Sequence, residues 1–272
     1  MGRITKSFIE LKREHRRGFI PFITAGDPDL ATTRKLIVEL ARAGATVIEL
    51  GLPFSDPMAD GPVIQRASER ALRNGFGVAE ALQTVAEARR ETEVPIILFS
   101  YFNPLLQFGI EKLAREAENA GVDGVLVTDL APEEANEFAA ALRVQGLDVI
   151  FLAAPTSTDE RLKMLAERAS GFIYAVSRAG VTGARAEISA EAEKLVERLR
   201  RVSNLPIAVG FGISKPEHVT DVWRYADAAV VGSAIVEEIE RLQRSSDLVA
   251  RIGQFAQRLL AGESHVQARE AT

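Results

Sequence analysis

Short runs of apolar residues alternate with longer segments of helical periodicity along nearly the whole chain. The short runs contain few polar residues, which is typical of parallel strands covered on both faces. The longer segments repeat their apolar residues with the spacing of helices that bury one side. Strands are predicted at residues 19–24, 46–50, 95–99, 124–128, 148–152, 172–176, 207–210 and 228–231.

Helical segments follow these predicted strands in regular alternation. They are predicted at residues 31–42, 79–90, 111–120, 132–144, 158–169, 190–202, 216–225 and 233–244. Pro132 and Pro216 suit the first turns of helices, and Gly44 and Gly121 follow helix ends. This alternation predicts an α/β protein with the (β/α)8 architecture of a TIM barrel. An open doubly wound sheet is the alternative, but no GxGxxG motif opens the first helix.

Two further helices are predicted outside the repeating units. Residues 4–14 have the pattern of a short amphipathic helix, which we expect to cover the bottom of the barrel. Residues 61–74 predict an extra helix in the second βα unit. No change of composition divides the chain, so residues 1–272 are expected to form a single TIM-barrel domain. Residues 262–272 are polar and are expected to be a frayed tail.

The amino-acid composition argues against several classes of function. The net charge of −5 argues against a general nucleic-acid or anionic-membrane surface, but leaves room for a small anionic substrate. No apolar run approaches the roughly 20 residues of a membrane span, and the N-terminal segment lacks a signal-peptide pattern, so a cytoplasmic location is expected. The absence of cysteine excludes thiolate chemistry, and His15, His218 and His265 lack metal-ligand spacing. We therefore expect no metal site.

The segment ELGLPFSDPMADGP at residues 49–62 carries the strongest candidate chemistry. Glu49 ends an apolar predicted strand, where burial disfavours the charged form of a carboxyl group. An acid kept in such a place usually transfers protons. Asp60 lies at the far end of the following loop and could face Glu49 across a substrate. Asp27 and Asp56 precede prolines, and for them turn formation is at least as good an explanation as function.

Glycines after the last two predicted strands suggest a phosphate site. Gly210, Phe211 and Gly212 follow one strand, while Gly232 and Ser233 follow the next. Glycine lets backbone N–H groups approach a ligand, and Ser233 can cap a helix whose N-terminus attracts anions. TIM barrels often bind phosphate in these loops. The alternative is that the glycines merely turn the chain.

Large apolar side chains near the predicted strand ends suggest the other half of the ligand. Strand residues usually belong to the core, so this observation gains weight only beside the phosphate site. Together, the two features suggest a substrate with a flat aromatic end and a phosphate end. The candidate side chains are Phe22, Leu98, Phe99, Leu126, Tyr174 and Phe211.

The sequence closely resembles the tryptophan synthase alpha subunit family. The segment VIELGLPFSDPMADGPVIQRA is the most specific of the matching motifs, which follow family order and spacing over nearly the whole chain. The other matching segments are GFIPFITAGDPD at 18–29, GVDGVLVTDLAP at 121–132, YAVSRAGVTG at 174–183, VGFGIS at 209–214 and VGSAIV at 231–236. The tail after about residue 262 matches nothing.

The resemblance implies a reaction and a set of site residues. The reaction is the retro-aldol cleavage of indole-3-glycerol phosphate to indole and glyceraldehyde 3-phosphate. Glu49 would protonate indole C3 and deprotonate a glycerol hydroxyl, while Asp60 would stabilise positive charge on the indole nitrogen. Tyr174 would lie near Glu49, and Thr182 would help to position Asp60. The resemblance further implies an indole pocket of Phe22, Phe99 and Leu126 and a phosphate site of Gly183, Phe211, Gly212, Gly232 and Ser233.

The resemblance also implies a partner. Family members form an alpha2beta2 heterotetramer with a beta subunit that carries pyridoxal phosphate, so no cofactor is expected in this chain. Pro53, Asp56 and the loop at 177–185 would communicate with that subunit, and the loop could act as a lid. The alternatives are a stand-alone indole-3-glycerol phosphate lyase that releases free indole, another phosphate-binding barrel, and a non-enzyme that only activates a partner.

Overall fold

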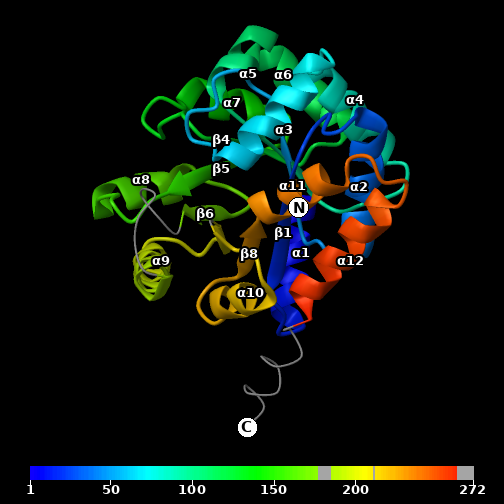
Figure 1. Ribbon diagram of the computed structural model, residues 1–272. Coiled ribbons are helices and arrows are strands. Elements are labelled where there is room, and N and C mark those ends of the chain that lie inside the picture. Colours follow the sequence, from blue (N-terminus) through cyan, green and yellow to red (C-terminus); the bar gives the residue numbers. More distant parts are fainter. Residues whose placement is uncertain (177–184, 211, 262–272) are drawn as a thin grey trace.

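A computed structural model of the chain (Figure 1) describes residues 1–176, 185–210 and 212–261. Its strands close into a barrel in chain order, and every neighbouring pair is parallel. The predicted (β/α)8 barrel is therefore confirmed. The strands are β1 (Gly18–Thr24), β2 (Ile48–Gly51), β3 (Ile96–Ser100), β4 (Gly124–Val127), β5 (Asp148–Ala153), β6 (Ile173–Val176), β7 (Ile207–Gly210) and β8 (Ala228–Val231).

Helices surround the barrel (Figure 1), and most of them lie close to the predicted ranges. Those of the first half are α1 (Arg3–Arg13), α2 (Leu30–Arg42), α3 (Pro62–Arg73), α4 (Val78–Ala88), α5 (Phe102–Phe108) and α6 (Ile110–Ala120). Those of the second half are α7 (Asn136–Val144), α8 (Asp159–Arg168), α9 (Arg185–Arg200), α10 (Pro216–Trp223), α11 (Ser233–Leu242) and α12 (Leu248–Leu260). The extra helices predicted near the N-terminus and in the second βα unit are α1 and α3.

The helix boundaries differ from prediction at several places. Helix α7 begins at Asn136, because residues 132–134 form a turn, so Pro132 precedes the helix instead of occupying its first turn. Helix α9 begins earlier than expected, at Arg185. Helices α5 and α12 were not predicted. The first is a short helix directly after a strand, and the second buries Leu248, Ile252 and further apolar residues against the outside of the barrel.

Strand pairing decides which side chains face the barrel interior. Phe22 on β1 is the register partner of Glu49 on β2, and Glu49 is the partner of Ile97 on β3. Successive strand residues point to opposite faces, so Thr24 shares the inner face with Phe22, and Gly51 shares it with Glu49. Below this layer an apolar cluster fills the barrel, with members that include Ile20, Val47, Ile97, Leu126, Ile150, Phe172 and Tyr174.

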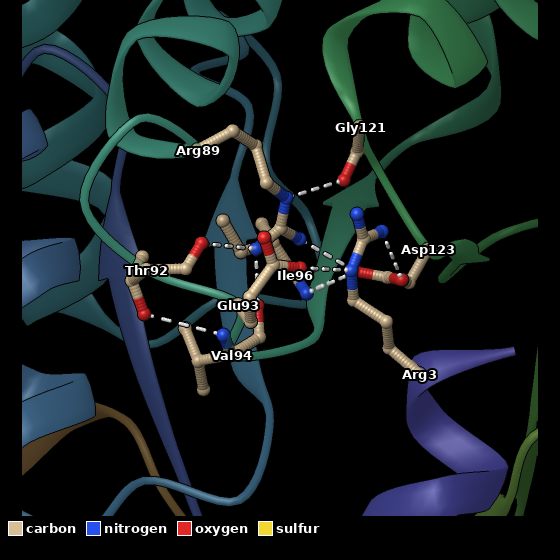
Figure 2. Close-up of polar contacts among 8 residues, drawn as sticks. All are labelled: Arg3, Arg89, Thr92, Glu93, Val94, Ile96, Gly121 and Asp123. Carbon is tan, nitrogen blue, oxygen red and sulfur yellow. Dashed lines mark hydrogen bonds and ion pairs between the residues drawn. The ribbon is translucent and has the colours of Figure 1, made fainter.

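Helix α1 closes the amino-terminal end of the barrel. Ile4, Phe8 and Leu11 of this helix join the interior cluster. Arg3 Nη1 donates to Asp123 Oδ1 at 3.0 Å, while Arg89 Nη2 and the Ile96 N–H donate to Asp123 Oδ2 at 2.6 and 2.8 Å (Figure 2). The Asp123 side chain is 5% exposed, so its charge is compensated by these donors in place of water. This carboxylate ties α1 to the starts of β3 and β4.

We expect Asp123→Ala to lower the free energy of unfolding by about 3 kcal/mol, because the Arg89 guanidinium, 10% exposed, would lose its charge partner. Denaturant unfolding measures this change. As a control, Asp159→Ala removes an ion pair between Arg198 and an aspartate that is 77% exposed, and it should cost about 1 kcal/mol or less. Equal effects of the two substitutions would contradict the role given to Asp123.

Candidate active site

A pocket opens at the carboxyl ends of β1, β2 and β3, where TIM barrels place their active sites. Strand residues form its floor, while the loop after β2, helix α3 and the segment after β3 form its walls. Its lining residues are Phe22, Thr24, Gly51, Leu52, Asp60, Ile64, Ser68, Phe99, Ser100 and Tyr101. Glu49 lies two residues before Gly51 on the same face of β2, one layer below the pocket.

Glu49 is a buried carboxyl group without charge compensation. The residue is 1% exposed, and its Oε1 atom has no hydrogen-bond partner among the described residues. Burial raises the pKa of Glu49 well above its ordinary value. Burial therefore favours the protonated form of the Glu49 carboxyl group, and in this form the group can act as an acid.

Tyr174 on β6 lies near enough to Glu49 for the two groups to interact electrostatically. Burial, and then the charge of Glu49, raises the pKa of the Tyr174 phenol well above its ordinary value. Gly210 on β7 makes room for the phenol, because a Cβ at that position would lie 1.9 Å from Tyr174 Oη. The need for glycine here is therefore steric and independent of any phosphate.

Asp60 precedes α3 and lies at the pocket wall. Burial raises the pKa of Asp60 to about 6, although a hydrogen bond with the Tyr101 side chain lowers it in part. Tyr101 Oη also accepts a hydrogen bond from the Ala59 N–H at 2.9 Å, and Gln65 Nε2 donates to the Asp60 carbonyl oxygen at 2.9 Å. The side chains of Tyr101 and Gln65 therefore both hold the loop segment that contains Asp60.

Tyr101 is a site residue that was not selected from the sequence. It is 5% exposed and lies directly after β3, so the position at a strand end was the only available signal. Its role depends on the contact with the loop that carries Asp60, and the spacing between residues 60 and 101 does not reveal this contact.

Two aromatic rings form the apolar part of the pocket. Phe22 and Phe99 meet edge to face, with ring centroids 5.3 Å apart and an interplanar angle of 81°. Gly51 lies against this pair, because a Cβ there would come within 2.4 Å of the Phe22 ring. Leu126 is fully buried in the interior cluster below. The arrangement suits a flat apolar ligand group above the layer that contains Glu49.

Gly232, one of the candidate phosphate residues, lies beside the same pocket at Phe22. Gly232 is the N-cap of α11, whose first residue is the exposed Ser233, and a Cβ on Gly232 would lie 3.6 Å from Phe22 Cβ. The positive end of the α11 dipole therefore lies beside the aromatic pair. Gly212 has φ +71°, a left-handed conformation that favours glycine. Thr182, Gly183 and Phe211 lie outside the described residues.

The Asp27 side chain forms an ion pair with α3, a contact that differs from the side-chain turn expected from its sequence pattern. It is 1% exposed, and Arg70 on α3 donates to both of its carboxylate oxygens at 2.8 and 2.9 Å. Arg70 Nη1 also donates to Glu240 Oε1 on α11 at 2.7 Å. These contacts join the loop after β1, the helix after Asp60 and the helix after Gly232.

The loop between β2 and α3 carries the residues that the resemblance assigns to a partner. Pro53 is buried, whereas Asp56 is exposed and accepts a hydrogen bond from Ser55 Oγ at 2.5 Å. Met58 in the same loop is 92% exposed. The exposed side chains of this loop thus lie only a few residues from Asp60.

Other classes of site find no support in the part of the chain that the structure describes. None of its His, Asp and Glu residues gather in a group that could hold a metal ion. No helix within residues 1–176, 185–210 and 212–261 is long and apolar enough to cross a membrane.

The fold and the site define a TIM-barrel enzyme in which two carboxyl groups, those of Glu49 and Asp60, lie in different environments at the carboxyl ends of the strands. The family model "Tryptophan synthase alpha chain" matches residues 8–263. The alpha chain of Solibacter usitatus is 48% identical over 262 residues, covering 96% of this chain and 98% of that protein. The alpha chain of Geobacter sulfurreducens is 52% identical over 241 residues, covering 89% and 91%. The chain belongs to the tryptophan synthase alpha chain family.

Solved structures agree with this assignment. The alpha subunit from Legionella pneumophila superimposes with a TM-score of 0.90 at 38% identity, covering 97% of this chain and 99% of that one. A structure of the Pyrococcus furiosus tryptophan synthase a2b2 complex gives a TM-score of 0.83 at 43% identity, covering 89% and 97%.

Proposed function

We propose that this chain cleaves indole-3-glycerol phosphate to indole and glyceraldehyde 3-phosphate, as the family to which it belongs implies. The observation that carries the proposal is the buried Glu49 carboxyl group below an aromatic pocket, where burial raises its pKa and favours the protonated form. Cleavage of the bond to indole C3 needs an acid at that carbon, and a carboxyl group with a raised pKa supplies one at neutral pH.

Glu49 serves both proton transfers of the reaction. The Glu49 proton goes to indole C3, and positive charge develops on the indole nitrogen. The resulting carboxylate then takes the proton of the glycerol hydroxyl as the carbon–carbon bond breaks and the aldehyde carbonyl forms. The electron pair of that bond returns to the indole ring, and Glu49 regains its proton. Tyr174 lies beside this exchange.

Asp60 stabilises the positive charge on the indole ring by accepting the hydrogen bond of the indole N–H. This role requires the carboxylate form, which prevails above a pKa of about 6. Tyr101 supports the position of Asp60 from the side of β3. The two carboxyl groups thus take different roles: burial favours the protonated form of Glu49, whereas Asp60 acts as the carboxylate above its pKa of about 6.

Two parts of the site bind the substrate: the aromatic pair and the N-terminus of α11. Phe22 and Phe99, with Leu126 below them, hold the indole. The backbone N–H groups near Gly232 and Ser233, together with Gly212, hold the phosphate. Thr182, Gly183 and Phe211 are predicted to complete the site.

A beta subunit is the expected partner, in an alpha2beta2 heterotetramer like that named for the Pyrococcus furiosus protein. Pro53 and Asp56 in the loop before Asp60, with the loop at 177–185, would face it. The pyridoxal phosphate belongs to that subunit, and this chain needs no cofactor of its own. Residues 1–272 are proposed to form one domain that acts in the cytoplasm, and the tail predicted at 262–272 lies outside the described residues.

Incubation of the purified chain with indole-3-glycerol phosphate, with and without a tryptophan synthase beta subunit, tests the proposal. We expect slow release of indole by the chain alone and a strong increase with the partner. Fast cleavage that ignores the partner would favour the stand-alone lyase, which shares every catalytic residue. No cleavage in either sample would refute the proposed activity.

A further inference from the structure

One buried hydroxyl group at the pocket has no assigned role. Within residues 1–176, 190–210 and 212–261, the buried side-chain polar atoms without a hydrogen-bond partner are Oγ1 of Thr24 and Oε1 of Glu49. A buried polar group without a partner costs free energy, so each such group calls for an explanation. Glu49 has one in its proposed chemistry, and Thr24 does not.

Thr24 lies at the point where the pocket meets the loop before α3. It ends β1, is the register partner of Gly51 and is 2% exposed. Its side chain shares the inner face of β1 with Phe22 and lines the pocket together with Asp60 and Tyr101. The Thr24 side chain therefore borders the space that the indole ring and the Asp60 carboxylate are proposed to share.

The Asp60 carboxylate has capacity for a further donor. A carboxylate accepts several hydrogen bonds, and the side-chain donor for Asp60 among the described residues is Tyr101. Substrate binding would displace water from the pocket and remove the donors that water supplies. Two strand residues with hydroxyl groups line the pocket. The Ser100 hydroxyl already donates to the Tyr101 carbonyl oxygen at 2.9 Å, whereas the Thr24 hydroxyl has no hydrogen-bond partner.

We propose that Thr24 is a positioning residue that donates a hydrogen bond to the Asp60 carboxylate in the substrate complex and aims it at the indole N–H. The inference rests on the proposed cleavage reaction. In the free protein, the unpaired Thr24 hydroxyl group costs free energy. This cost is explained if the hydroxyl group forms its hydrogen bond only when substrate is bound. A hydroxyl group with a purely structural role would already have a hydrogen-bond partner in the free protein, whereas that of Thr24 has none among the described residues.

Thr24→Val and Thr24→Ser separate these roles. Valine keeps the shape and removes a hydroxyl without a partner, so the unfolding temperature should stay the same or rise by a few degrees. The kcat for indole release should fall about tenfold or more, since the lost bond goes to a charged group. Thr24→Ser keeps the donor and should retain most of the kcat.

The pH profile identifies the group on which Thr24 acts. The acidic limb of kcat reports ionisation in the substrate complex, and that of kcat/KM reports the free enzyme. Thr24→Val should move the acidic limb of kcat to higher pH and leave that of kcat/KM in place. The other titratable groups near this pocket are Glu49, Tyr101 and Tyr174, and burial raises the pKa of each of them.

Thr84→Val is the matched control. Thr84 is also buried, but it lies on α4 and its hydroxyl donates to the Glu80 carbonyl oxygen at 2.8 Å, so its loss should lower stability and leave kcat unchanged. Wild-type kcat in Thr24→Val would overturn the inference, as would a lowered kcat with an unmoved acidic limb, which would indicate direct contact with the ligand. A wild-type chain that releases no indole would refute the proposed function, and the inference with it.

Discussion

Glu49→Gln is expected to abolish release of indole, with a loss of about 10³-fold or more, because an amide cannot donate and recover the proton that the reaction needs. Glutamine has nearly the same shape, and burial already favours the uncharged form of the carboxyl group that it replaces, so folding and binding of a non-cleavable substrate analogue should change little. Indole release and analogue binding measure the two effects separately.

Glu118→Gln serves as the control for this substitution, because Glu118 is exposed on α6 and should tolerate the change without effect. A Glu49→Gln chain that kept more than a few per cent of wild-type activity would refute the assignment of proton transfer to Glu49. Loss of analogue binding together with activity would indicate instead that Glu49 mainly shapes the pocket.

Asp60→Asn should lower the kcat by about 10²-fold or more, because asparagine can still accept the indole N–H but supplies no negative charge against the charge that develops on the ring. The pH profile gives a second signature. Burial raises the pKa of Asp60 to about 6, so the wild-type chain should lose activity as the pH falls through that value and Asp60 takes up a proton. The variant should lack this acidic limb.

Asp221→Asn is a suitable control for Asp60→Asn, because Asp221 lies on α10 with a side chain that is 53% exposed. It should leave the rate and the profile unchanged. Near-normal turnover of Asp60→Asn would remove Asp60 from the mechanism, and a low rate with an unchanged acidic limb would assign that limb to another group.

The two carboxyl groups differed in how far the sequence could identify them. Glu49 stood out because an acid at the end of an apolar strand run predicts burial and a raised pKa. Asp60 did not stand out on composition alone, since aspartate is common in loops of glycine and proline. Its environment arises from Tyr101, which approaches from the next strand and contacts both Asp60 and the Ala59 N–H.

By itself, the sequence determined the barrel, the order of its strands and the positions of Glu49 and of the glycines after β7 and β8, because local periodicity records which residues are buried. Only the tertiary structure shows the ion pair of Asp27 with Arg70, the contact of Tyr101 with the loop that carries Asp60, and the Thr24 hydroxyl group without a partner. Each of these features depends on strand register and helix packing. Such contacts leave no mark in local periodicity, because the residues that meet lie far apart along the chain.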